Sequence, residues 1–87
     1  MIKIETESGF SCEIREDLGG DYELLELLIR LDQGDQTALP AALNLVLGEK
    51  QKAALLEHLR GEDGRVRTLE VHKALLEIFR ARNSLKN

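Results

Sequence analysis

The residues with the best types and spacing for chemistry lie in the stretch Glu57–Glu70, EHLRGEDGRVRTLE, where acidic side chains surround two glycines. The chemistry to test is calcium binding, because an EF-hand loop places carboxylates at fixed distances from an invariant glycine. With Gly64 on that glycine, Asp63 and Glu70 fall on ligand positions and Val66 falls on the usual apolar position. The second half of the stretch therefore matches the template.

The first half of the same template fails. Leu59 and Gly61 occupy ligand positions although neither has a side-chain oxygen, and Arg67 adds a positive charge. Calcium takes about six to eight oxygen ligands, so the pattern does not predict a metal site. The pair Asp63-Gly64 is typical of a turn, since glycine adopts positive φ at little cost. The stretch is therefore predicted to be a bend between two helices, and whether it also contacts a partner stays open.

The remaining reactive side chains do not form a catalytic or metal-binding pattern. The single cysteine, Cys12, cannot form an intramolecular disulfide and is predicted to be a small buried apolar residue. The two histidines, His58 and His72, lie beside charged residues on predicted polar faces and have no metalloprotease spacing. Glycine-rich phosphate loops and nucleophile motifs are also lacking. We expect no catalytic residue, cofactor or metal, and therefore no enzyme.

Length and composition further narrow the classes of protein to which this chain can belong. A chain of 87 residues forms one small domain, residues 1–87. Its net charge of -4 argues against nucleic-acid binding, which depends on lysines and arginines. The three aromatic residues, Phe10, Tyr22 and Phe79, are too few for a base-stacking surface. No apolar run reaches the roughly 18–20 residues of a membrane span, so we expect no membrane insertion and a soluble, intracellular protein.

The elements that carry these residues follow from hydrophobic periodicity. Apolar and polar residues alternate in 2–15, which predicts a β-hairpin that must pack on helices or pair with another chain. Residues 21–83 predict a helical bundle and 84–87 a frayed tail. The fold class is therefore mainly α (α+β), an N-terminal β-hairpin followed by a compact bundle of about four short helices. The predicted helices cover residues 22–33, 38–47, 49–59 and 68–83, with Gly48 ending the second.

Two of these helices carry more apolar surface than one small chain readily buries. Helix 22–31 is apolar around most of its circumference, which is wider than a surface helix needs. Asn44 is the only polar side chain between Ala38 and Leu47, and that segment is either a central core helix or a helix facing a partner.

Much of the chain resembles the small tail assembly chaperones of tailed phages and prophages of Gram-positive bacteria. The resemblance rests on GFSCEIREDLGGDYELLELLIRLDQGD, ALPAALNLVLGEKQKAALLEHLRGEDGRV and the final RNS. Its most specific parts are Asp21 to Leu25, Ala38 to Pro40, Leu47 to Gln51, and His58 to Val66, where Gly61 departs from the pattern, as does Arg67 just beyond.

The resemblance implies a non-enzymatic chaperone in the cytoplasm of the host bacterium. Such proteins bind the long helical tape measure protein, keep it soluble and help recruit tail tube subunits, and some also exist in a longer form made by frameshifting, of which this chain would be the short one. If so, we expect apolar contacts with the partner from Leu24, Leu28, Leu43 and Val46. Each of the four could equally be plain core.

A structural role is the alternative. The hairpin edge and the apolar helix faces could bury each other in a homo-oligomer, either as a self-assembling tail component or as a small interaction module.

Overall fold

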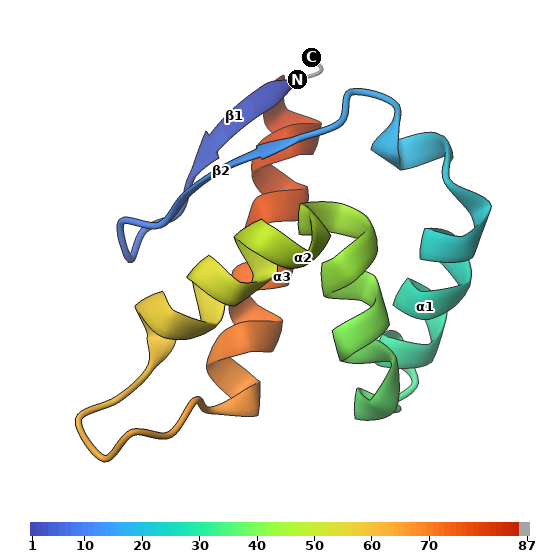
Figure 1. The fold of residues 1–87 in the computed structure, drawn as a ribbon. Coiled ribbons are helices and arrows are strands. Elements are labelled where there is room, and N and C mark those ends of the chain that lie inside the picture. Colours follow the sequence, from blue (N-terminus) through green and yellow to red (C-terminus); the bar gives the residue numbers. More distant parts are fainter. Residues whose placement is uncertain (86–87) are drawn as a thin grey trace.

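The computed structural model describes residues 1–85 as a two-stranded hairpin followed by three α-helices (Figure 1). The predicted hairpin and the mainly helical fold are confirmed. The hairpin lies across the upper part of the last helix in Figure 1, and the N-terminus lies near the end of that helix.

The hairpin forms because its apolar side chains alternate with polar ones. Strand β1 (Ile2–Glu5) pairs antiparallel with β2 (Ser11–Ile14), and the register places Ile4 opposite Cys12. Ile4, Cys12 and Ile14 are all buried, so one face of the hairpin covers the helices. A two-stranded sheet is marginal alone in water, and this packing supplies the burial that it needs.

Helix α1 (Tyr22–Asp32) begins at an N-cap. The side chain of Asp21 accepts a hydrogen bond of 3.1 Å from the backbone amide of Leu24, and this satisfies one of the free amides of the first turn. Only Leu24 and Leu31 of α1 are buried. The helix therefore uses only part of its wide apolar face within the chain. Three large apolar side chains of α1 stay exposed: Tyr22, Leu25 and Ile29.

Helix α2 (Leu39–Leu59) corrects the predicted number of helices. The turn η2 (Gln36–Ala38) leads into it, and Pro40 lies in its first turn, where a missing amide costs little. Gly48 was predicted to end a helix. Its φ of 78° and ψ of 163° instead kink α2, and the helix resumes directly afterwards, so the segments predicted as two helices are two arms of one element. The described chain has three helices, and the prediction of about four was wrong.

Helix α3 (Thr68–Leu85) completes the core. Its Leu75 and Ile78 are fully buried, as is Leu55 from the second arm of α2. Of the tail predicted at 84–87, residues 84 and 85 belong to α3, and 86 and 87 lie outside the described residues. No helix among residues 1–85 is long and apolar enough to cross a membrane.

Candidate partner-binding groove

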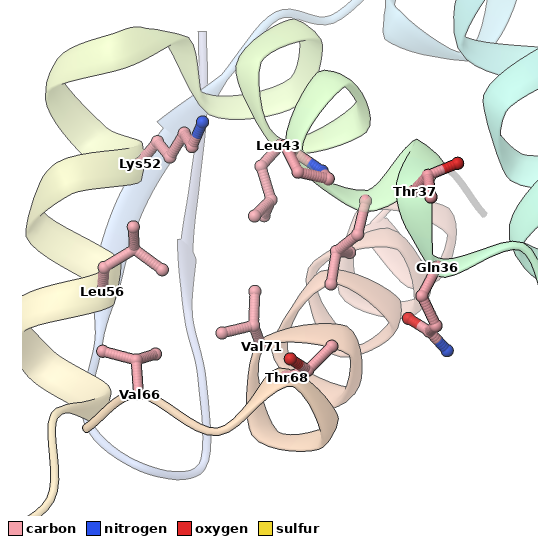
Figure 2. A pocket seen from close by; sticks show the side chains of 10 residues that line it. Gln36, Thr37, Leu43, Lys52, Leu56, Val66, Thr68 and Val71 are labelled. Carbon is pink, nitrogen blue, oxygen red and sulfur yellow. The ribbon is translucent and has the colours of Figure 1, made fainter.

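An open apolar groove lies between the two arms of α2 and the start of α3 (Figure 2). Its volume is about 530 Å³, which is within the range of pockets that hold small ligands or side chains of a partner. Among residues 1–85, Lys52 is the only charged residue in its lining. We call this surface the α2 groove, and its apolar lining consists of Leu39, Pro40, Leu43, Leu56, Val66 and Val71.

The kink of α2 and the loop after it create the α2 groove. Gly48 turns the helix axis, so the two arms diverge and Leu43 and Leu56 come to line the same hollow. Figure 2 shows Leu56 and Val66 along one wall, with Leu43 and Val71 facing them. A straight α2 would not place these side chains around one space.

The acidic loop that first suggested a calcium site is closed by its own interactions. The carboxylate of Asp63 accepts hydrogen bonds from the backbone amide of Arg65 at 3.0 Å and from the guanidinium of Arg67 at 2.7 Å. Arg67 and that amide hold the pKa of Asp63 below its ordinary value. Arg60 donates to the carbonyl oxygen of Gly64 at 2.7 Å and fixes the other side of the turn.

The other carboxylates at the ends of the loop are also paired. Glu57 forms an ion pair of 3.0 Å with Arg60, which lowers the pKa of Glu57, and Glu70 lies 3.5 Å from Lys73. Within residues 1–85, no group of three or more His, Cys, Asp or Glu side chains is placed to hold a metal ion. The loop connects α2 to α3, and its side chain in the lining of the α2 groove is that of Val66.

The four leucine and valine side chains predicted to contact a partner do not share one surface. Leu24, Leu43 and Val46 are buried, with exposures of 2%, 2% and 4%. Leu43 nevertheless reaches the α2 groove and forms part of its lining. Leu28 is half-buried and lines a different hollow between α1 and α3, the α1–α3 groove, whose lining is Leu28, Leu31, Asp32, His72, Leu76 and Phe79.

The histidines and the cysteine have structural surroundings. His58 Nε2 lies 3.0 Å from the carbonyl oxygen of Ser8, which can only accept, so Nε2 carries the hydrogen and ties the hairpin turn to α2. His72 Nδ1 lies 3.4 Å from the side-chain amide of Gln36. Cys12 is buried, and that burial raises the pKa of its thiol, which disfavours the nucleophilic thiolate.

Several residues of the α2 groove were missed by reasoning from the sequence. Leu56, Val66 and Val71 were not predicted to contact a partner. Of the segments that form this groove, the apolar run from Ala38 to Leu47 had indicated surplus apolar surface. Comparisons of the chain with protein-family models, with curated proteins and with solved structures found no match.

Proposed function

We propose that this protein is a non-enzymatic tail assembly chaperone that binds apolar helical segments of a phage tape measure protein in the host cytoplasm. The observation that supports the proposal is the α2 groove, an open apolar hollow with a volume of about 530 Å³. A small chain that leaves such a surface open is suited to shield apolar residues of another protein.

The apolar lining of the α2 groove suits the apolar face of an amphipathic helix. Helices that bind in grooves insert apolar side chains spaced three or four residues apart, and their polar face stays in water. Leu43, Leu56 and Val71 would receive such side chains, and Lys52 would favour a carboxylate at the edge of the bound segment. The recognition is therefore by apolar burial, with one ionic contact for orientation.

Co-expression with a tape measure protein is the direct test. We expect the long partner to become more soluble and to co-purify with this chain. If the partner stays insoluble and does not co-purify, the proposal fails.

A pair of matched variants locates the contact. Val66→Glu places a charge in the α2 groove, whereas Ala54→Glu adds the same charge at an exposed position on α2 outside the lining. We expect Val66→Glu to reduce co-purification about tenfold or more and Ala54→Glu to leave it unchanged. Equal effects of the two variants would remove the α2 groove from the proposal.

A structural tail component is the second candidate. It is favoured by the exposed Tyr22, Leu25 and Ile29, which would be buried in an assembly of many copies. Purified virions distinguish the two roles, because a chaperone leaves before the tail is mature and a structural component stays.

A further inference from the structure

The outer side of β1 is an open sheet edge. Residue pairs of an antiparallel sheet alternate between pairs that exchange backbone hydrogen bonds and pairs whose backbone groups point away from each other. The amide of Thr6 donates to the carbonyl oxygen of Phe10 at 2.8 Å, which makes this pair a hydrogen-bonded one. Two pairs alternate from there to Lys3 and Glu5, whose amides and carbonyls therefore point outward. We call this side of the strand the β1 edge, and the sheet of residues 1–85 has no third strand there.

The opposite edge of the hairpin, on β2, is closed by a side chain of α2. Oε1 of Gln51 accepts a hydrogen bond of 2.7 Å from the amide of Glu13, and its Nε2 donates to the carbonyl oxygen of Glu13 at 2.8 Å. These are the two backbone hydrogen bonds that a neighbouring strand would make. Figure 1 shows β1 on the outer side of the hairpin, with β2 between it and α2. Since a free strand edge is a template for another chain, the β1 edge is the one left open for pairing.

The side chains along the β1 edge are complementary to a second copy of themselves. Lys3 and Glu5 are exposed and lie on either side of Ile4. Among residues 1–85, no ion pair includes either of them. If two β1 strands pair antiparallel with Ile4 opposite Ile4, then Lys3 of each strand lies opposite Glu5 of the other. The same two pairs bring the outward backbone groups together, so hydrogen bonds and ion pairs form in one register.

We propose that the partner of the β1 edge is the β1 strand of a second copy of this chain. The two copies are related by a twofold axis that passes through the sheet between their Ile4 residues. A twofold interface brings the same strand of both copies together. The axis is perpendicular to the sheet, so the two hairpins form one sheet whose helices all lie on the same side. Because Gln51 closes each outer β2 edge, the assembly stops at two copies.

The charges also select the register and the edge. An axis centred on Lys3 would place Lys3 opposite Lys3, and one centred on Glu5 would place Glu5 opposite Glu5. Like charges directly opposite each other destabilise a sheet. On β2, a twofold pairing centred on Cys12 would place Ser11 opposite Glu13 and form no ion pair. Pairing of β1 with β1 around Ile4 is therefore the arrangement in which charge and backbone agree.

The first test is the molar mass of the full chain at increasing concentration, measured by sedimentation velocity. The contact is one pair of short strands, so we expect a dimer with a dissociation constant in the range of about 10 µM to about 1 mM. Glu5→Lys places two lysines opposite each other on both sides of the axis and should weaken the dimer about tenfold. Glu62→Lys makes the same change of charge at an exposed position of the loop before α3 and should not weaken it.

A mixture of two variants tests the pairing of charges directly. Lys3→Glu should also weaken the dimer. When it is mixed with Glu5→Lys, each strand carries one kind of charge, and the mixed dimer should regain roughly the wild-type dissociation constant. Both positions are exposed, and circular dichroism checks that each variant is folded.

Amide hydrogen exchange locates the contact on the backbone. The outward amides of Lys3 and Glu5 should exchange more slowly as the concentration rises through the dissociation constant, because they become hydrogen-bonded only in the dimer. The amide of Glu13 is already bonded to Gln51, so its exchange should change less.

A chain that stays monomeric up to about 1 mM overturns the proposal. So does a dimer in which the amides of Lys3 and Glu5 gain no protection, or one that Glu5→Lys leaves unchanged. If the β1 edge instead binds an extended segment of another protein, the isolated chain is monomeric and the second copy is rejected. Co-purification of a tape measure protein is a separate measurement on the α2 groove, so either proposal can fail alone.

Discussion

At the scale of single residues, the acidic loop shows that carboxylates can match part of a metal template while they are paired with groups of the same chain. The carboxylate of Asp63 accepts hydrogen bonds from the backbone amide of Arg65 and the guanidinium of Arg67, and the carboxylate of Glu70 pairs with Lys73. The template could be tested from the sequence, since the missing oxygens at Leu59 and Gly61 are visible there. The groups that pair with these carboxylates could not be predicted from the sequence, because the pairing depends on how the turn folds.

The first prediction concerns the pH dependence of Asp63. Arg67 and the amide of Arg65 lower its pKa in the folded protein, so the interaction stabilises the fold above the unfolded pKa of about 4 and is lost as the pH falls through the lower, folded pKa. Asp63→Asn should lower the melting temperature slightly at pH 7. The difference from wild type should narrow between about pH 5 and about pH 3.

Glu62→Gln is the control for Asp63→Asn, because it removes a neighbouring exposed charge. A difference in melting temperature for Asp63→Asn that stays constant down to pH 3 would show that the carboxylate charge is not what stabilises the loop.

The second prediction concerns the contact between Gly19 and Arg82. Arg82 is a buried side chain, 4% exposed, and its Nη2 donates to the carbonyl oxygen of Glu16 at 3.0 Å. A methyl group on Gly19 would lie 2.8 Å from that nitrogen. Gly19→Ala should therefore displace Arg82 and reduce the free energy of unfolding by about 1–3 kcal/mol, measured by urea denaturation.

Gly20→Ala is the matched control for Gly19→Ala. A methyl group on Gly20 meets no atom within 4 Å, so its effect should be much smaller. Equal destabilisation by both substitutions would mean that the turn η1 (Leu18–Gly20), and not the contact with Arg82, sets the cost.

At the scale of elements, periodicity predicted what local sequence controls. The hairpin followed from alternating residues, and α3 from its apolar spacing, because each of these two patterns matches one face that packs on the core. The joining of the two arms of α2 could not be predicted. Glycine is equally suited to end a helix and to kink one, and the choice depends on how Leu43 and Leu55 reach the same core.

The third prediction concerns the kink of α2. Gly48 has φ 78° and ψ 163°, a conformation open almost only to glycine. A methyl group there would meet no atom within 4 Å, so the cost of Gly48→Ala is that of the backbone alone, about 1–3 kcal/mol in the free energy of unfolding. Urea denaturation measures this cost, and Gly20→Ala, without positive φ, is again the control.

If Gly48→Ala instead leaves stability unchanged, the chain adopts another conformation at this position. The divergence of the arms, and with it the α2 groove, would then not depend on glycine.

At the scale of the whole molecule, the two grooves use different elements. The α2 groove belongs to α2, the loop after it and the start of α3, whereas the α1–α3 groove belongs to α1 and the middle of α3. Neither lining could be assembled from the sequence. Each combines side chains from segments far apart in the chain, and spacing within one helix does not show which helices diverge.

The fourth prediction follows from this separation. Val66→Glu should reduce co-purification of a tape measure segment about tenfold or more, because Val66 lines the α2 groove. Leu25→Lys, on an exposed face of α1 outside that lining, should leave co-purification unchanged, as should the control Ala54→Lys. If Leu25→Lys also abolished co-purification in a protein that is still folded, the exposed face of α1 would belong to the binding surface.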